Sequence, residues 1–532
     1  MGRTGWGVVI FAWQLYCYVH SEAMFSRTYG MPWPMPQKFE LLDFNLTLTK
    51  CDFHIISNYA CDILTHALEY YDNVVFGREK KQGGLHTCRA VFGSAIENAL
   101  LTFEIVVDTP CPMYPRVNMS EHYDLIMRRN GSIVLRAPEV WGALRGLETF
   151  SQLVIPGETV DIVRGANVKD YPRFSHRGIL LDTARHFLSV DIIKQNIEIM
   201  SQNKFNVFHW HIVDDQSFPF ESEALPSLSA YGAYSSAHVY HPWDVAEIIE
   251  YARLWGVRVV PEFDSPGHMA SWGLGKLLLL SDCAFNEQQH YEQLKTLGVI
   301  DPTKEENYKI LGKIFEKVLT RFKDNYLHLG GDEIPQFCWR NRNKVPQLRK
   351  AEKQDAMSLI TFHFKNLLGS IRSKVRDFTP VYWHDAFQYV VNLTSKAVFQ
   401  VWKLNDFWYD VDVITRSGHA VILSSCWYLN FISYKPDWRR FYTCDPRALS
   451  SGTRQQRKLI IGGEVCLWGE YVDDTNVLQL LWPRAAAAGE RLWSSVLQSN
   501  ADAALPRLEE HRCRMLGRGY PAQPLNGPGF CA

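Results

Sequence analysis

The second part of the chain repeats one pattern, in which short apolar runs alternate with amphipathic stretches of helical spacing. Eight such runs cover residues 178–182, 205–212, 257–263, 326–329, 380–383, 397–402, 420–424 and 459–463. Continuously apolar strands that alternate with helices are typical of a parallel sheet covered on both faces. Eight repeats predict an α/β fold with a (β/α)8 TIM-type barrel. A doubly wound open sheet is the alternative, although no GxGxxG motif follows the first run.

The residues before this repeat show a mixed pattern. Strand-like runs occur at 53–56, 101–107 and 133–135, and helical spacing occurs at 61–71 and 139–153. In the second of these helices, Val140, Leu144, Leu147 and Phe150 recur on one face. We therefore expect a smaller α+β domain over residues 24–165 with a structural role, followed by the barrel over residues 166–532.

The first residues have the pattern of a secretory signal. Arg3 precedes a mostly apolar stretch at 5–18, and small and polar residues follow through Ala23. This stretch is too short to span a bilayer, which predicts a signal peptide at 1–23 and no stable membrane insertion. Four N-glycosylation sequons point to the same lysosomal or secreted destination, at Asn45, Asn118, Asn130 and Asn392.

Charge and composition restrict the classes of function that the protein could have. The 532 residues carry 56 Lys and Arg against 57 Asp and Glu, and this balance argues against nucleic-acid binding. The 17 tryptophans indicate either an aromatic core or a binding site built from flat rings. Of the 12 cysteines, Cys17 would leave with the signal, so at least one of the remaining eleven has no intramolecular partner.

Polar and aromatic residues close or follow each of the eight runs. In a barrel, the carboxyl ends of the strands share one rim, where active sites are built. Residues far apart in the sequence are therefore expected to converge there, and they come from the segments Asp182–Arg185, Asp214–Asp215, Asp264–His268, Asp332–Glu333, Trp383–Asp385, Trp402–Lys403, Trp427–Asn430 and Trp468–Glu470.

Rings, acids and an arginine at one rim favour a sugar substrate. Hydrolysis of a glycosidic bond needs a general acid, and a neighbouring carboxylate would keep one member of Asp332–Glu333 protonated. Neighbours on a strand point to opposite faces, however, whereas the ordinary retaining pair flanks the bond. One solution is that the substrate's 2-acetamido oxygen is the nucleophile, with one acid protonating the leaving group and the other steering the acetamido N–H.

Each of these residues also has a plainer explanation. An Asp-Glu dipeptide is usually surface charge, Arg185 could form a structural salt bridge, and Asp214–Asp215 could cap a helix. His268 could be a turn residue, and each tryptophan could be core. Their joint position after apolar strands favours the functional interpretation.

Six long segments carry a family resemblance, at residues 176–188, 206–223, 262–269, 328–334, 427–435 and 462–474. In these segments the chain resembles the β-N-acetylhexosaminidases of glycoside hydrolase family 20, in the animal lysosomal form, and the resemblance extends over residues 41–532. It implies retaining removal of terminal non-reducing GlcNAc or GalNAc from β-linked glycans or glycolipids through an oxazolinium intermediate. No metal or cofactor is implied, and a homodimer is expected.

The resemblance also implies roles for individual residues. Glu333 is similar to the general acid/base, Asp332 to the residue that orients the acetamido group, and Tyr428 to the one that holds its oxygen. Trp383, Trp402 and Trp468 would wall the site, while Arg185 and Glu470 would bind ring hydroxyls. Further substrate-binding or supporting positions are Asp214, Asp264, His268 and Asn430. The implied disulfides are Cys61–Cys111, Cys283–Cys338 and Cys513–Cys531, with Cys51–Cys88 and Cys426–Cys444 as further candidate pairs.

Two positions depart from the family pattern. The fifth run ends in Trp383-His384-Asp385, where family members commonly have Trp-Gln-Glu, so the outer rim or the pH response could differ. Forms that act on neutral sugars tend to carry an acid where Asn430 stands, and forms that accept charged sugars pair an asparagine with a following arginine. Phe431 follows Asn430 here, so neither preference transfers. We expect neutral substrates, because no cation occupies that position.

Two alternatives belong to other functional classes. A zinc amidohydrolase is suggested by His209-Trp-His211, which puts two imidazoles on one face of a strand. That motif lies inside the second run rather than at its end, which argues against the alternative. A non-catalytic carbohydrate-binding protein would keep the site without turnover, but the intact Asp332 and Glu333 argue against it.

Overall fold

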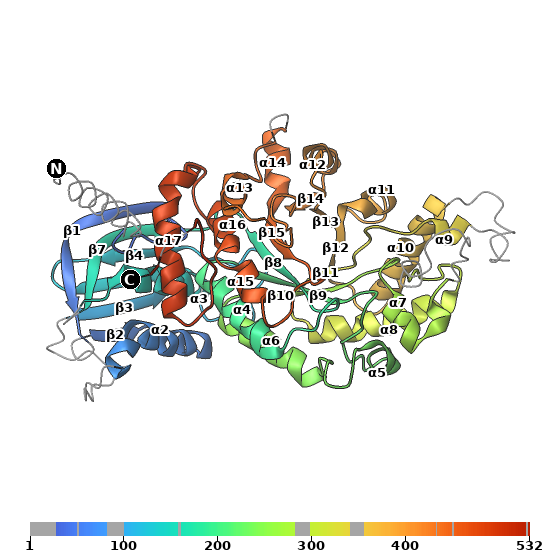
Figure 1. Cartoon of the computed structure of the whole chain (residues 1–532), viewed down its shortest axis with the longest axis horizontal. Coiled ribbons are helices and arrows are strands. Elements are labelled where there is room, and N and C mark those ends of the chain that lie inside the picture. Colours follow the sequence, from blue (N-terminus) through green and yellow to red (C-terminus); the bar gives the residue numbers. More distant parts are fainter. Residues whose placement is uncertain are drawn as a thin grey trace, which may run out of the picture.

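The structure is a computed structural model that describes residues 28–49, 53–81, 101–157, 161–281, 298–340, 356–431, 433–449, 452–527 and 530–531. An open sheet with two helices lies at one end of the long axis, and a barrel surrounded by helices forms the rest (Figure 1). The predicted signal peptide at 1–23 lies outside the described residues.

The N-terminal part is a mixed sheet with the strand order β1-β7-β4-β5-β3-β2, and β6 pairs with β7 at the side. Helices α2 (Asp62–Lys81) and α3 (Val140–Leu153) belong to the same part. The strands are β1 (Lys38–Leu48), β2 (Phe53–Ser57), β3 (Leu101–Val107), β4 (Tyr123–Met127), β5 (Ser132–Ala137), β6 (Val154–Ile155) and β7 (Asp161–Asp170). The sequence predicts a domain boundary after residue 165, whereas β7 continues in the N-terminal sheet to Asp170.

The predicted barrel is confirmed. Eight parallel strands close in the order β10-β11-β12-β13-β14-β15-β8-β9, and each contains part of one of the eight apolar runs. Its strands are β8 (His176–Asp182), β9 (Val207–Val213), β10 (Arg258–Phe263), β11 (Tyr326–His328), β12 (Thr379–Trp383), β13 (Val398–Val401), β14 (Ala420–Leu423) and β15 (Ile460–Leu467). Every residue of β8, β9 and β10 is buried, which explains the apolar runs within them.

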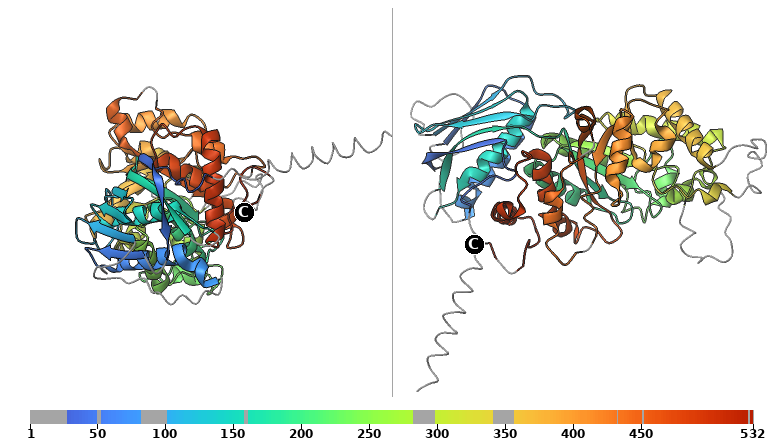
Figure 2. Two further views of the ribbon diagram at one scale, coloured as in Figure 1. Left: turned by 90° about the vertical axis from the view of Figure 1, so that its left-hand side faces the viewer. Right: turned by 90° about the horizontal axis from the view of Figure 1, so that it is seen from above.

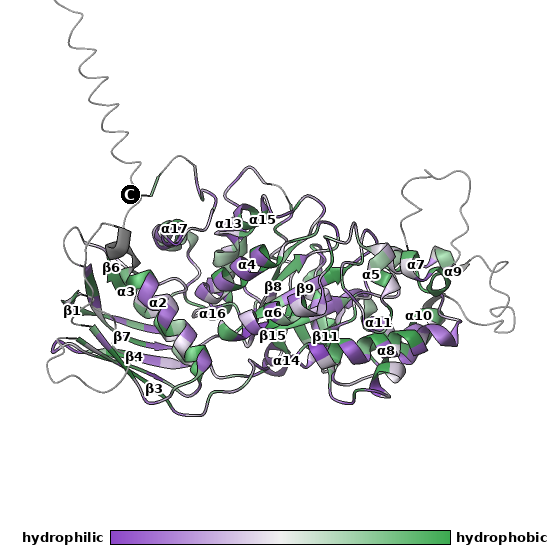
Figure 3. Ribbon diagram, turned by 90° about the horizontal axis from the view of Figure 1, so that it is seen from below, coloured by the Kyte–Doolittle hydropathy of each residue, from purple (hydrophilic) through white to green (hydrophobic). Residues whose placement is uncertain are grey.

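Helices surround the barrel and bury their apolar faces against it. Leu311, Ile314 and Val318 recur at helical spacing on the buried face of α8, and the ribbon of α8 alternates hydrophilic and hydrophobic colours (Figure 3). The helices are α4 (Val190–Gln202), α5 (Ser227–Gly232), α6 (Pro242–Leu254), α7 (Ala270–Gly275), α8 (Glu305–Arg321), α9 (Phe337–Arg340), α10 (Ala356–Arg372), α11 (Phe387–Val390), α12 (Phe407–Arg416), α13 (Trp438–Thr443), α14 (Arg454–Leu459), α15 (Val477–Leu481), α16 (Arg484–Trp493) and α17 (Ala501–Gly517). Short 3-10 turns occur at η1 (Leu277–Leu279) and η3 (His384–Ala386).

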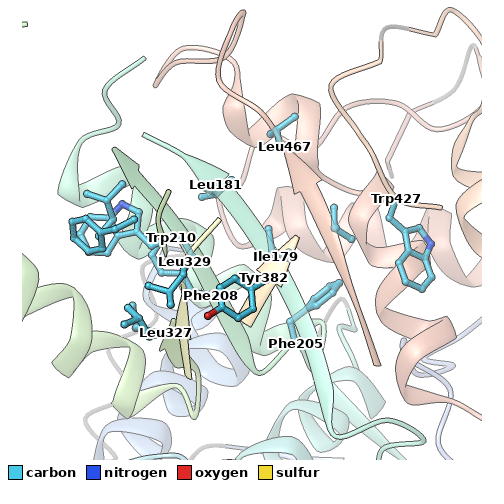
Figure 4. Packing of buried hydrophobic residues seen from close by; sticks show 14 of the residues in the cluster. Ile179, Leu181, Phe205, Phe208, Trp210, Leu327, Leu329, Tyr382, Trp427 and Leu467 are labelled. Atoms are coloured by element: carbon cyan, nitrogen blue, oxygen red, sulfur yellow. The ribbon is translucent and has the colours of Figure 1, made fainter. Parts of the chain in front are cut away.

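The main core lies between the barrel strands and these helices. Figure 4 labels Ile179 of β8, Phe208 and Trp210 of β9 and Tyr382 of β12, which belong to one apolar cluster. Close packing of this kind fixes where each strand ends, and therefore where the rim residues lie. Within the described residues, no helix combines the length and apolar character that a bilayer crossing needs.

A buried ion cluster joins the two parts of the chain, which lie side by side along the long axis (Figure 2). Glu121, from the N-terminal part, accepts hydrogen bonds from Arg145 of α3 at 3.0 Å and from Arg177 of β8 at 2.6 Å. All three side chains are at most 1% exposed. Helix α17 adds a second connection, because Arg518 at its C-terminal end contacts both Glu148 of α3 and Gln202 of α4.

Candidate active site at the barrel rim

The two predicted catalytic acids lie on a tight loop after β11. Gly330 and Gly331 have positive φ angles of 63° and 97°, and Glu333 has a φ of 44°. A Cβ at Gly330 would lie 1.7 Å from Asp264 Oδ1, so this turn requires glycine. The acids follow the strand instead of lying within it, and the opposite-face difficulty raised by the sequence therefore does not arise.

Asp332 and Glu333 both approach one histidine. His268 Nε2 lies 3.8 Å from Asp332 Oδ2 and 3.9 Å from Glu333 Oε2. The Asp332 side chain is 11% exposed and that of Glu333 is 60% exposed. One acid is therefore held inside the protein, while the other faces the solvent side of the rim, where a leaving group would depart.

Asp214 and Arg185 connect to this histidine. Asp214 Oδ1 lies 3.1 Å from His268 Nδ1, and Asp214 Oδ2 lies 2.9 Å from Arg185 Nη2. Arg185 also donates to Asp182 Oδ2 at 3.0 Å and stands over the Trp468 ring at 5.1 Å. Ends of β8 and β9 and the loop after β10 thus contribute to one continuous polar network.

Burial and charge set the protonation of these groups. Burial would lower the pKa of His268, but the carboxylates of Asp214, Asp332 and Asp264 outweigh it and raise that pKa well above its usual range. Burial and the Asp332 charge raise the pKa of Asp264 well above its usual range. Burial and the same Asp332 charge raise the pKa of Glu333, as a general acid requires.

Trp383, Trp402 and Trp468, which lie at or just after the ends of β12, β13 and β15, belong to one aromatic group. Trp383 and Trp468 have ring centroids 5.8 Å apart, and Trp402 stacks with Tyr428 at 5.9 Å with an angle of 25° between the planes. Trp383 is 1% exposed, while Trp402 and Trp468 are partly exposed. These rings form an aromatic surface of the kind that packs against the apolar face of a sugar ring.

The Tyr428 hydroxyl belongs to the same aromatic group as Trp383, Trp402 and Trp468. Burial raises the pKa of this hydroxyl well above its usual range, so it keeps a proton to donate. Among the described residues, no donor lies within hydrogen-bonding distance of Asp332 Oδ1, a buried acceptor. The site therefore presents one donor and one acceptor that could meet the oxygen and the N–H of an amide.

The remaining rim residues lie further out. Glu470 is exposed, and its charge adds to those of Asp214 and Asp182 in raising the pKa of Arg185. Asn430 is partly exposed, and Phe431 stacks on Tyr428 at 6.2 Å.

The departure at Trp383-His384-Asp385 forms an ion cluster at the outer rim. Asp385 Oδ2 accepts a hydrogen bond from Trp402 Nε1 at 2.8 Å, and Asp385 Oδ1 lies 2.5 Å from Lys403 Nζ. His384 lies 3.4 Å from Asp410. The Asp385 charge contributes to the raised pKa of Glu333, so this unusual segment acts on the candidate acid.

Sequence reasoning missed a set of charged groups inside the barrel, centred on Glu262 and Glu464. These carboxylates contact histidines of neighbouring strands and lie beneath the rim. They lie within strands whose other residues are mostly apolar, so the sequence pattern does not reveal them; their one signal is the His209-Trp-His211 alternation, which also suggests a zinc site. Among the described residues, three groups of side chains are close enough to hold a cation, namely His209 with Glu262 and His328, Asp214 with Asp215 and His268, and Asp264 with His268 and Asp332.

The cysteines and sequons are placed as follows. Disulfides join Cys61 to Cys111, Cys426 to Cys444 and Cys513 to Cys531. Cys338 is disulfide-bonded, but its expected partner Cys283 lies outside the described residues, as do Cys51 and Cys88. Cys466 is a buried free thiol that packs with Trp383 and Tyr428. The asparagines of all four sequons are exposed: Asn45, Asn118, Asn130 and Asn392.

Family models match both parts of the chain. The model described as "Glycosyl hydrolase family 20, catalytic domain" matches residues 174–496, and one described as "beta-acetyl hexosaminidase like" matches residues 32–153. The chain belongs to glycosyl hydrolase family 20, and its enzyme class is β-N-acetylhexosaminidase. This class favours a glycosidase over the zinc amidohydrolase alternative.

Individual relatives agree with the family. The chain is 42% identical over 508 residues to the β-hexosaminidase subunit beta of Felis catus, with 94% of this chain and 93% of the relative covered. It is 39% identical over 521 residues to the subunit alpha of Bos taurus, with 94% of each covered. Among solved structures, the Flavobacterium johnsoniae chitobiase has a TM-score of 0.80 at 26% identity and covers 92% of this chain and 73% of its own.

Proposed function

We propose that this enzyme is a retaining exo-glycosidase that removes terminal non-reducing GlcNAc or GalNAc from β-linked glycans or glycolipids, with the substrate's own acetamido group as nucleophile. The observation that carries the proposal is the pairing of buried Asp332 with exposed Glu333 around His268. Two adjacent carboxyls of such different exposure suit two different tasks, namely steering an internal amide and protonating an outward leaving oxygen.

In the first step the acetamido carbonyl oxygen forms a bond to the anomeric carbon. The bond from that carbon to the leaving oxygen breaks, and Glu333 transfers its proton to the departing alcohol. The positive charge spreads over the oxazolinium ring, and the Asp332 carboxylate stabilises it through the acetamido N–H. The Tyr428 hydroxyl would donate to the carbonyl oxygen and keep it in line with the anomeric carbon.

In the second step water attacks the anomeric carbon from the face that the alcohol has left. Glu333, now a carboxylate, accepts a proton from this water, and the bond to the acetamido oxygen breaks. Two displacements on one carbon return the β configuration. Trp383, Trp402 and Trp468 would hold the acetamido group and the sugar ring, while Arg185, Glu470 and Asn430 would bind ring hydroxyls.

The destination and assembly belong to the same proposal. Four exposed sequon asparagines and three disulfides between described cysteines support a lysosomal or secreted glycoprotein. We further propose that the enzyme forms a homodimer. We also propose that it prefers neutral sugars, since Phe431 and not a cation follows Asn430.

The decisive experiment compares the wild type with Glu333→Gln on nitrophenyl GlcNAc and GalNAc glycosides. General acid catalysis predicts a loss of about 10²–10⁴-fold in kcat for the variant. A GlcNAc-derived thiazoline, which mimics the oxazolinium ring, should inhibit the wild type competitively, and product NMR should show retention. Thiazoline binding without turnover by the wild type would instead support the non-catalytic carbohydrate-binding alternative.

A further inference from the structure

One buried carboxylate inside the barrel contacts two separate parts of the candidate site. Glu262 on β10 is 0% exposed. It lies in register with His211 of β9 on one side and His328 of β11 on the other, so these three side chains share one layer of the barrel interior.

Four nitrogen atoms from three other strands surround this carboxylate. Trp383 Nε1 donates to Glu262 Oε1 at 2.7 Å, and His328 Nδ1 lies 3.1 Å from the same oxygen. On Oε2, His211 Nδ1 lies at 2.7 Å and His209 Nε2 at 3.0 Å. A buried carboxylate is tolerated only when its charge is compensated in this way, and its position is then tightly fixed.

One arm of this arrangement reaches the aromatic wall. Trp383 is almost completely buried and is the member of the aromatic group that lies deepest, next to His328 and Trp468. Its indole N–H points at Glu262, so the plane of the ring is set by that hydrogen bond as well as by packing.

The other arm reaches the acid/base network. His211 uses its second nitrogen, Nε2, to contact Asp214 Oδ2 at 2.7 Å. Burial would lower the pKa of His211, but the charges of Glu262 and Asp214 raise it well above its usual range, so the ring is an imidazolium that donates to both carboxylates. Asp214 then contacts Arg185 and His268, and His268 faces the two candidate acids.

We propose that Glu262 is a positioning residue that holds the two halves of the site in register: the Trp383 ring directly, and the Asp214–His268 network through His211. It touches no substrate atom and acts through these neighbours. The inference rests on the proposed function, because it assigns Glu262 a role in that same reaction.

A matched control lies in the same core. Glu464 on β15 is also a buried carboxylate, and it contacts His176 Nε2 at 2.6 Å, His209 Nδ1 at 2.8 Å and Gln400 Nε2 at 2.9 Å. None of these partners is Trp383 or His211. Glu464→Gln therefore removes an equivalent buried charge without touching either arm.

The test measures kcat, KM and the inhibition constant of the GlcNAc-derived thiazoline for the full-length wild type, Glu262→Gln and Glu464→Gln. Thermal unfolding scans verify that each variant is folded. We expect kcat/KM of Glu262→Gln to fall about 10²-fold, since a small misplacement of reacting groups has that effect. The inhibition constant of the thiazoline for this variant should rise about tenfold. For Glu464→Gln, kcat/KM and the inhibition constant should both stay within about threefold of the wild-type values.

A second variant separates the two arms. In His211→Asn, the amide nitrogen can replace Nδ1 toward Glu262, but the shorter side chain does not reach Asp214. This variant should lose kcat while keeping the thiazoline constant of the wild type, and it decides the matter if Glu262→Gln does not fold.

Three results would overturn the inference. The first is a folded Glu262→Gln with the kcat/KM and the thiazoline inhibition constant of the wild type. The second is a folded His211→Asn with the kcat of the wild type. The third is a loss in Glu464→Gln equal to that in Glu262→Gln, which would mean that removing any buried charge of the core has this effect. Absence of turnover in the wild type would instead count against the proposed function.

Discussion

The indole N–H of Trp402 donates to Asp385 Oδ2 at 2.8 Å, so a rim carboxylate orients one of the three rings of the site. This carboxylate belongs to the Trp383-His384-Asp385 segment, where the chain departs from the usual family sequence. It also sits close enough to Glu333 to raise the pKa of that acid.

Two substitutions of Asp385 separate its charge from its hydrogen bond. Asp385→Asn keeps an acceptor for Trp402 but removes the negative charge, so the pKa of Glu333 falls and the alkaline limb of the kcat/KM profile moves to lower pH. Asp385→Leu also frees the indole, and the lost hydrogen bond should raise KM about tenfold. Asp410→Asn, which alters only the His384 side of the cluster, serves as the control; an unchanged KM in Asp385→Leu would contradict the orienting role.

The pH dependence of the wild type should report the protonated form of Glu333. Burial and Asp332 raise the pKa of this group above its ordinary value, so the acid form persists to higher pH than in a free carboxyl. Activity therefore falls as pH rises through that pKa. A dinitrophenyl glycoside, whose leaving group needs little protonation, should show a much weaker alkaline limb than the nitrophenyl glycoside. Equal alkaline limbs for these two substrates would argue against Glu333 as the acid.

Arg185 should matter for both stability and binding. Its side chain is 13% exposed and pairs with Asp182 and Asp214, so Arg185→Met removes the cation beside buried Asp182 and one of the cations beside buried Asp214. We expect the free energy of unfolding to fall by about 3–5 kcal/mol and KM to rise, measured by urea denaturation and steady-state kinetics. Arg185→Lys keeps the charge but loses the planar guanidinium group, so its free energy of unfolding and its KM should lie between those of the wild type and Arg185→Met.

The control for Arg185 is an exposed ion pair of the same protein. Lys194 and Glu247 lie 2.6 Å apart with side chains 25% and 52% exposed. Lys194→Met should change the free energy of unfolding by at most about 1 kcal/mol. A similar loss in Lys194→Met and Arg185→Met would mean that burial does not set the strength of these pairs.

The junction between the two parts of the chain should depend on Glu121. Glu121→Ala leaves Arg145 and Arg177 buried without a counter-charge, and should lower the free energy of unfolding by about 3–5 kcal/mol. Asp43→Ala, at an exposed pair with Arg129, should have almost no effect.

The same junction has a pH signature. Burial opposes the charge of Glu121, yet Arg177 and Arg145 hold its pKa below the usual value in the folded protein. Its stabilising effect is therefore present above the unfolded-state pKa and is lost as pH falls through the folded-state value. The difference in stability between wild type and Glu121→Ala should shrink on acidification, and a constant difference would contradict this assignment.

The barrel could be predicted because its strands are covered on both faces and therefore read as unbroken apolar runs. Strands β1, β4 and β7 were missed, since their half-exposed positions mix charged and apolar residues, as in Lys38–Leu48. The rim residues were predictable from their place after each run. Glu262 and Glu464 were not, because the pattern of a strand does not reveal which interior side chains carry compensated charge.

The close approach of Gly330 to Asp264 fixes the loop of the two acids against the turn that carries His268. There is no space for these two backbone segments to slide past one another. Folding therefore brings the reactive groups together, and the site needs no rearrangement before it reacts with a bound sugar.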